Sequence, residues 1–163
     1  MNKTLTFITL ILVSILLITV QSTLLSPGRG GYLFPDLNLI FIVFLAVYSE
    51  TKGSFLIAAG NGYMMDVLSG NLPGTFTISR LSAYLLVRTS SSHVYLRKVI
   101  VQGLVIFLTT IFTWTFIMTI IRIKSNAGFH LTFGEIMLQG LVNSVVGVPL
   151  FWAAGRMHAR LQK

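Results

Sequence analysis

The sequence predicts a single all-α membrane domain over residues 1–163, built as a bundle of six transmembrane helices. Hydrophobic residues make up 54% of the chain and charged residues only 10%, whereas soluble domains carry roughly a quarter charged residues. The apolar residues gather in runs, several of which approach the ~20 residues that cross a bilayer. The chain has no cysteine, which excludes disulfides, thiol nucleophiles and thiolate metal sites.

We expect helices over residues 5–25, 36–48, 53–68, 76–87, 99–121 and 135–155. Five helices are the main alternative, because the three middle runs are short. The positive-inside rule favours six. With the N-terminus in the cytoplasm, six spans leave only Arg29, Arg122 and Lys124 outside, and Arg80 within a span. The cytoplasmic basic residues are then Lys3, Lys52, Arg88, Arg97, Lys98, Arg156, Arg160 and Lys163.

The first run, residues 5–25, follows Lys3 and could also be a secretory signal peptide. A signal peptide has an apolar core of about 7–15 residues and a small-residue cleavage site. This run is longer, residues 21–26 give at most a weak cleavage site, and further apolar runs follow. We therefore interpret it as a retained first helix.

The three middle helices are separated by short polar or turn-forming segments. Pro35 and Asp36 open the helix over residues 36–48, since proline suits a first turn and a carboxylate meets the positive end of the helix dipole. Residues 69–74 contain Gly70, Asn71, Pro73 and Gly74. This composition predicts a tight turn between the third and fourth helices.

The last two helices have the clearest signals. Residues 99–121 form a run without a single charge. Thr132 and Glu135 have the spacing of a capping box, in which each side chain binds a free amide at a helix start. Pro149 predicts a kink in the last helix, because proline removes a helical hydrogen bond.

Asp66 and Arg80 are the most informative residues, because an ionisable group at membrane depth is costly and often functional. The third and fourth helices are predicted to run antiparallel through a tight turn, which places both residues at similar depth near the outer face. We expect an Asp66–Arg80 ion pair. The pair can pin one helix to the other, or it can serve function directly; a proton relay would need further acidic groups at depth.

Two helices carry faces of small residues, which allow close helix packing in lipid. One face holds Ala59, Gly62 and Asp66, and the other holds Gly140, Ser144 and Gly147 beside Asn143. These faces serve packing within the chain or docking of a partner's transmembrane helix. Polar side chains within the spans can hydrogen-bond between helices. They are Gln102, Gln139 and Asn143.

Several classes of function are disfavoured. The net charge of +8 lies in short loops, and no basic stripe interleaved with aromatics follows a nucleic-acid backbone. His93, His130 and His158 fall in separate segments on both sides of the predicted membrane, so they cannot form one metal site. No phosphate-binding loop, zinc-protease motif or serine elbow is present. We therefore expect neither an enzyme nor a bound cofactor.

Residues 62–74, with Gly62, Asp66, Gly70 and Gly74, resemble the central signature of the bacterial rod shape-determining protein family MreD. Residues 35–37 and the segments 141–144 and 149–151 are also similar to that family. The carry-over of functional positions is limited to Asp66, Gly70, Gly74 and Asn143. Arg80 has no assigned place in the family pattern.

The resemblance implies a non-enzymatic scaffold of the cell-wall elongation machinery, in the bacterial inner membrane with both termini in the cytoplasm. MreD proteins associate with the bitopic protein MreC, and through it with MreB filaments, the wall synthase RodA and the elongation transpeptidase. The family's fold is similar to the six-helix substrate-binding subunits of energy-coupling-factor transporters. The resemblance thus implies that Asp66, Gly70, Gly74 and Asn143 shape the bundle and that its exposed apolar faces bind the partner's helix.

That similarity of fold supplies the alternative of a vitamin-binding transporter subunit. Such subunits usually carry an Ala-x-x-x-Ala face on the first helix. Here the first helix contains no alanine, and Ser14 is its only small residue before Gln21. Trp114 and Tyr32 keep a vitamin site open as an alternative. A secondary transporter is disfavoured by the chain's length and by the lack of a charge network at the membrane midplane.

Overall fold

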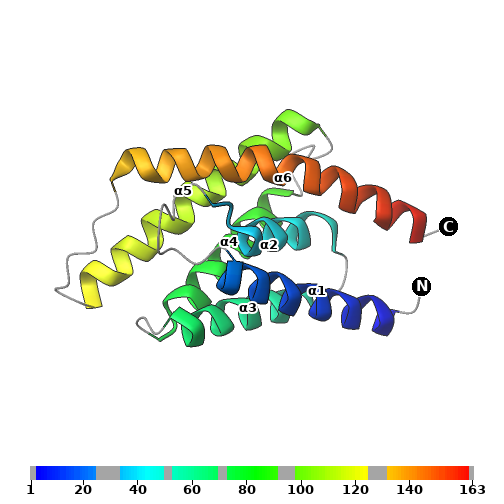
Figure 1. Ribbon diagram of the computed structural model, residues 1–163, viewed down its shortest axis with the longest axis horizontal. Helices are drawn as coiled ribbons and strands as arrows, with labels where there is room; N and C mark the ends of the chain where they lie inside the picture. Colours follow the sequence, from blue (N-terminus) through cyan, green and yellow to red (C-terminus); the bar gives the residue numbers. More distant parts are fainter. Residues whose placement is uncertain are drawn as a thin grey trace.

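The computed structural model describes residues 3–24, 34–49, 53–69, 73–91, 98–124 and 132–161, and these residues form helices and no strand. The helices are α1 (Lys3–Leu24), α2 (Leu37–Tyr48), α3 (Ser54–Ser69), α4 (Thr75–Ser91), α5 (Val99–Lys124) and α6 (Phe133–Leu161). The predicted all-helical class is confirmed. The first residues of α1 and the last of α6 lie at the same end of the molecule (Figure 1).

Three helices extend beyond the predicted apolar runs. α4 continues to Ser91, α5 to Lys124 and α6 to Leu161. An apolar run marks the part of a helix that is shielded from water, but polar side chains do not end a helix unless they supply a cap or a breaker. Arg88 also gives α4 a tertiary reason to continue, because its Nη1 donates to the carbonyl oxygens of Ala46 and Ser49, each at 3.1 Å.

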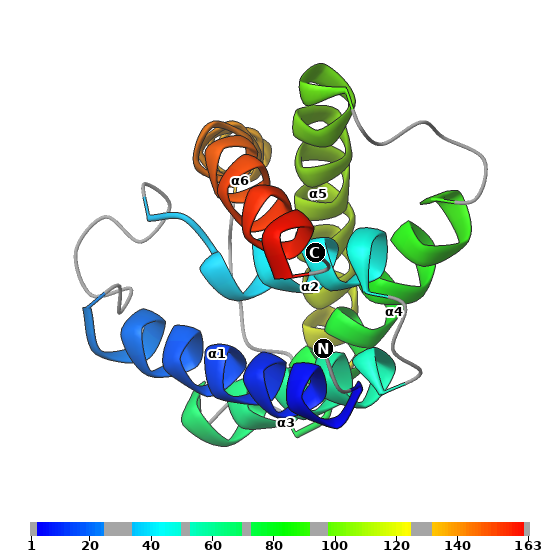
Figure 2. The same ribbon diagram turned by 90° about the vertical axis from the view of Figure 1, so that its right-hand side faces the viewer.

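The shortest helix, α2, lies in the middle of the bundle, with the other five around it (Figure 2). Its sequence is apolar on every face, which is typical of a fully buried helix. Leu39, Ile42 and Leu45 are completely buried in the core. α2 contacts each of the other helices, so its two ends decide which side chains meet in the interior.

The helices α3 and α4 pack as a close pair. A Cβ on Gly62 would lie only 2.5 Å from the Cα of Thr77, so glycine is required for this approach of the two backbones. Gly74 in the turn has a φ of 84°, a left-handed conformation that glycine adopts without steric cost. The small face around Gly62 therefore serves packing within the chain.

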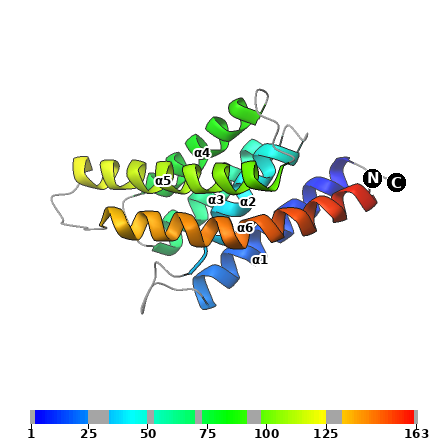
Figure 3. The ribbon, with the colours of Figure 1, turned by 90° about the horizontal axis from the view of Figure 1, so that it is seen from above.

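The helices α5 and α6 run side by side (Figure 3), and the small face of α6 lies against α5. A Cβ on Gly140 would come within 2.8 Å of the Phe107 ring, and one on Gly147 within 2.6 Å of another α5 side chain. Ser144 donates to the carbonyl oxygen of Gly103 at 2.9 Å. This face is therefore occupied inside the bundle and is not open to a partner.

Pro149 lies inside α6, and the helix changes direction about halfway along (Figure 1). Proline lacks the amide hydrogen that would bind the carbonyl of residue 145, and its ring crowds that carbonyl. The predicted kink is confirmed. At the start of the same helix, Glu135 Oε2 accepts from the Thr132 amide at 2.7 Å, and Thr132 Oγ1 accepts from the Glu135 amide at 3.4 Å, which confirms the capping box.

Among the described residues, three segments are long and apolar enough to cross a membrane: Leu5–Thr23, Val99–Lys124 and Phe133–Arg156. The other helices have 12, 16 and 17 residues, which is shorter than the ~20 that an untilted span needs. The described part of the chain is thus all-helical, and three of its helices have the length and composition of membrane spans. Six spans remain a prediction.

Candidate functional site

Asp36 forms the N-cap of α2 and lies at the centre of the buried polar groups. Its Oδ1 accepts from the amide of Leu39 at 2.9 Å, which satisfies one of the free donors at the helix start. The same oxygen accepts from Gln21 Nε2 on α1 at 3.1 Å. Gln21 Oε1 in turn accepts from the amide of Asn38 at 2.9 Å. α1 is therefore tied to the first turn of α2.

Arg80 on α4 forms a salt bridge from Nη2 to the free oxygen of Asp36, Oδ2. Its side chain is only 2% exposed, and that of Asp36 is 6% exposed. A buried charge is tolerated when it is paired and hydrogen-bonded. The carboxylate that compensates Arg80 is thus at the start of α2.

The predicted Asp66–Arg80 pair is therefore wrong. Asp66, near the end of α3, instead caps the start of α4. Its oxygens accept from the amides of Gly74 (3.1 Å), Phe76 (2.8 Å) and Thr77 (3.0 Å), and from the Thr77 hydroxyl at 2.5 Å. A helix start leaves four free amides and a positive dipole end, and both attract a carboxylate. These donors surround Asp66, so Arg80 is left to the other buried acid.

Asn143 on α6 closes the arrangement. Its Oδ1 accepts from the amide of Asp36 at 2.7 Å, and its Nδ2 donates to Thr110 Oγ1 on α5 at 3.0 Å. We call Gln21, Asp36, Arg80, Thr110 and Asn143 the Asp36 hub. The hub joins α1, α2, α4, α5 and α6 at one level of the bundle. Two predicted inter-helix amides are thereby confirmed, since Gln102 also donates to the Tyr48 hydroxyl, at 2.9 Å.

α3 is attached to the bundle by separate contacts. Asn61 Oδ1 accepts from Ser14 on α1 at 2.8 Å, and Ser54 is hydrogen-bonded to Tyr84 on α4 at 2.7 Å. Together with the Asp66 cap, these contacts fix α3 against α1 and α4. Asp66 and Gly62 therefore belong to one unit with Gly74, and that unit is distinct from the Asp36 hub.

Some predicted positions lie outside the described residues. They are Gly70, Tyr32, His93 and His130. Within the part of the chain that the structure describes, no group of three or more histidine or acidic side chains could hold a metal ion.

The role of Asp36 in pairing Arg80 was missed from the sequence. One signal could have indicated it: the chain has four acidic residues, and Asp36, like Asp66, belongs to one of the predicted middle helices that neighbour Arg80 in the sequence. Both acids are candidate partners for Arg80, and Asp66 is the nearer of the two along the chain. Asp36 pairs with Arg80 more favourably than Asp66 does, because an N-cap carboxylate that uses one oxygen for the helix start keeps its other oxygen as an acceptor.

The fold and the hub together define the class: an all-helical protein, over the described residues, with three helices of membrane-spanning length and a buried, charge-paired polar centre that joins five of its helices. No family model, curated protein or solved structure matches the chain.

Proposed function

We propose that this chain is a non-enzymatic integral membrane scaffold of bacterial cell-wall elongation, which binds a bitopic MreC-type protein and helps maintain rod shape. The observation that carries the proposal is an apolar groove between α1 and α3. Through that partner the scaffold would reach MreB filaments, the synthase RodA and the elongation transpeptidase. The resemblance of residues 62–74 to the MreD signature selects this system among those that use membrane scaffolds.

The groove has a volume of about 260 Å³. Its lining is mainly aliphatic and aromatic: Phe7, Ile11, Ile15, Ile18, Leu56, Ile57 and Met64, with Ser14, Gly60 and Asn61. A Cβ on Gly60 would meet nothing within 4 Å, so the groove is open to an incoming helix at this glycine. Small residues at such a place allow two helices to approach closely in lipid.

The floor of the groove carries one polar anchor. Asn61 is 1% exposed, and its Nδ2 has no hydrogen-bond partner among the described residues. Its Oδ1 is held by Ser14, which fixes the orientation of the amide. A buried N–H donor in an apolar groove favours a partner that brings an acceptor, such as a serine hydroxyl or a carbonyl on a transmembrane helix.

The proposed setting is the inner membrane, with six spans and both termini in the cytoplasm. The common position of the α1 start and the α6 end supports an even number of crossings (Figure 1). The shorter helices α2, α3 and α4 would cross with their polar ends in the interfacial regions. The basic residues then follow the positive-inside rule.

The test is site-specific photo-crosslinking in cells that co-express an MreC protein from the same source. A photo-reactive amino acid at Met64, which lines the groove and is 49% exposed, is expected to form an adduct with MreC. The matched control is Val145 on α6, which is 74% exposed and lies outside the groove. An adduct at Val145 with none at Met64 would place the partner elsewhere and reject the groove.

Affinity capture gives a second measure. Gly60→Leu fills the groove and is expected to reduce co-purified MreC several-fold, whereas Gly134→Leu, at another exposed glycine with open space around it, leaves capture unchanged. Absence of MreC from the captured material of the unaltered protein would contradict the proposal. A chain that purifies alone with a tightly bound vitamin would support the transporter-subunit alternative, although Ser14, the only small residue in its part of α1, is already bonded to Asn61.

A further inference from the structure

We infer that the chain holds a binding site for a compact, uncharged molecule with oxygen acceptors, between α2, α4 and α5 beside the Asp36 hub. This site goes beyond the proposed scaffold function and shares no residue with the α1–α3 groove. Its evidence is a set of buried polar groups that have no hydrogen-bond partner among the described residues.

Arg80 uses one nitrogen for Asp36, while its Nε and Nη1 have no partner among the described residues. Asn38 on α2 is 0% exposed, and neither its Nδ2 nor its Oδ1 has a partner there. On α5, the Thr113 hydroxyl and the buried indole nitrogen of Trp114 also have no hydrogen-bond partner among the described residues. Buried polar groups are nearly always hydrogen-bonded, and a buried group without a partner destabilises the fold.

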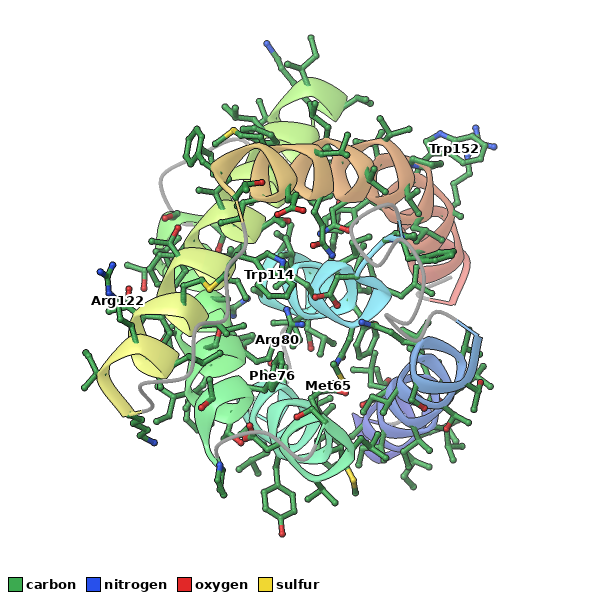
Figure 4. The ribbon with its side chains drawn as sticks, turned by 60° about the vertical axis from the view of Figure 1, so that its left-hand side comes forward. Met65, Phe76, Arg80, Trp114, Arg122 and Trp152 are labelled. Carbon is green, nitrogen blue, oxygen red and sulfur yellow. The ribbon has the colours of Figure 1, made fainter. Side chains whose placement is uncertain are left out.

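These groups come together because of the hub. Ser79, whose buried hydroxyl also lacks a partner in the described chain, precedes Arg80. Asn38 is two residues from Asp36, and Thr113 and Trp114 follow Thr110 by about one helical turn. Arg80 and Trp114 both point into the middle of the bundle, next to α2 (Figure 4). Arg80 and Trp114 therefore point into one region beside α2, and Asn38 and Thr113 each lie within about one helical turn of a hub residue on α2 and α5.

α2 is much shorter than its neighbour α5. Its 12 residues span roughly 18 Å, while the 26 residues of α5 span roughly 39 Å. Gln102 meets the C-terminal end of α2, and Thr110 meets its start through Asn143. Beyond Thr110, α5 continues for roughly 21 Å without α2 beside it. Phe76 and Met65 flank this region with apolar surface (Figure 4).

The chemistry of the free groups selects the ligand. Among the described residues of this region, the unpartnered N–H donors are Arg80 Nε and Nη1, Asn38 Nδ2 and Trp114 Nε1, and the unpartnered pure acceptor is Asn38 Oδ1. A donor-rich site requires acceptor oxygens. The charge of Arg80 is already balanced by Asp36, so a further anion would add an uncompensated buried charge. Carbonyl or hydroxyl oxygens on an uncharged molecule meet both conditions.

Trp114 provides a reporter. The chain has two tryptophans, and Trp152 is 56% exposed on α6, away from the site. In the full-length Trp152→Phe protein, titration with acetamide is expected to give a saturable change in Trp114 emission, on the order of millimolar for so small a probe. Acetate has the same shape with a negative charge, and is expected to bind at least about tenfold more weakly. The Trp114→Phe protein, which keeps Trp152, controls for solvent effects.

Asn38→Leu and Thr113→Val remove polar groups that have no partner in the described chain, at nearly constant volume. Each is expected to weaken acetamide binding about tenfold and to raise the melting temperature by about 2–4 °C. A structural role for these side chains predicts the opposite shift in melting temperature. The combination of higher stability with weaker binding is therefore the signature of a ligand site.

Three results would overturn the inference. The first is the absence of a saturable response to acetamide, which means that water alone occupies the region. The second is tighter binding of acetate than of acetamide. The third is loss of folding in Asn38→Leu or Thr113→Val, because it would show that these groups already have structural partners. None of these results bears on MreC capture through the groove, so the two proposals fail independently.

Discussion

Replacing Asp36 with asparagine tests the central ion pair while keeping the helix cap. Asparagine is as good an N-cap residue as aspartate, so its Oδ1 can still accept from the Leu39 amide. The changed group, Nδ2, would face Arg80 Nη2, and two donors would then point at each other. The guanidinium would remain buried at 2% exposure without a counter-charge.

The expected loss follows from that burial. Breaking a buried ion pair by removing one partner costs about 3–5 kcal/mol, because an uncompensated charge remains in the interior. For a chain of this size, such a loss lowers the melting temperature by about 6–20 °C. Replacing both partners with apolar or neutral groups is often close to neutral. The double variant Asp36→Asn, Arg80→Met is therefore expected to be more stable than Asp36→Asn alone.

The assay is thermal and denaturant unfolding in detergent micelles, arranged as a double-mutant cycle. The cycle for Asp36 and Arg80 is expected to give a coupling energy above about 2 kcal/mol, whereas the cycle for Asp66 and Arg80 stays near the ~0.5 kcal/mol of residues that share no partner. Glu135→Gln is the matched charge control, because glutamine preserves the capping box. Its effect is expected within about 0.5 kcal/mol.

Two results would refute this reasoning. A loss below about 1 kcal/mol in Asp36→Asn would mean that Arg80 does not depend on Asp36. A larger coupling for Asp66 than for Asp36 would restore the pair predicted from the sequence and reject the observed arrangement.

Two further changes test packing and the hub. Gly62→Ala forces a Cβ against the backbone of Thr77 and is expected to destabilise the protein by about 1–3 kcal/mol; Gly60→Ala, in the same helix with open space around it, is expected to stabilise by about 0.5–1 kcal/mol. If the two substitutions changed the free energy of unfolding in the same direction, that result would contradict the close approach of α3 and α4. Asn143→Ala leaves the Asp36 amide without its acceptor, so unfolding should show a loss of about 1–3 kcal/mol, and a neutral effect would remove Asn143 from the hub.

Much of the fold was predictable because it rests on local interactions. The apolar runs are continuous in the sequence, and the capping box at Thr132 and Glu135 and the kink at Pro149 each involve residues within about one helical turn. The cap at Asp36 is also local, and its place at the start of α2 was expected. Helix ends were less predictable where polar residues such as Arg88 continue a helix to reach partners on another helix.

The pairing of charges was not predictable in this way. Asp66 and Arg80 are close in sequence and were predicted to lie at similar depth. Closeness in sequence, however, does not show which other hydrogen-bond donors bind the same carboxylate. The start of α4 presents several amides to Asp66, while Asp36 has a free oxygen that faces Arg80. Only the packed structure decides that competition.

By itself, the sequence determined the class of this protein: an all-helical chain with apolar runs of membrane-spanning length and with local caps at the starts of α2 and α6. These properties depend on composition and on interactions a few residues apart. The tertiary structure decided that the short α2 lies at the centre and that Asp36 is the partner of Arg80. It also decided which polar groups stay unpartnered, because burial and hydrogen bonding across five helices depend on contacts up to 107 residues apart in the chain.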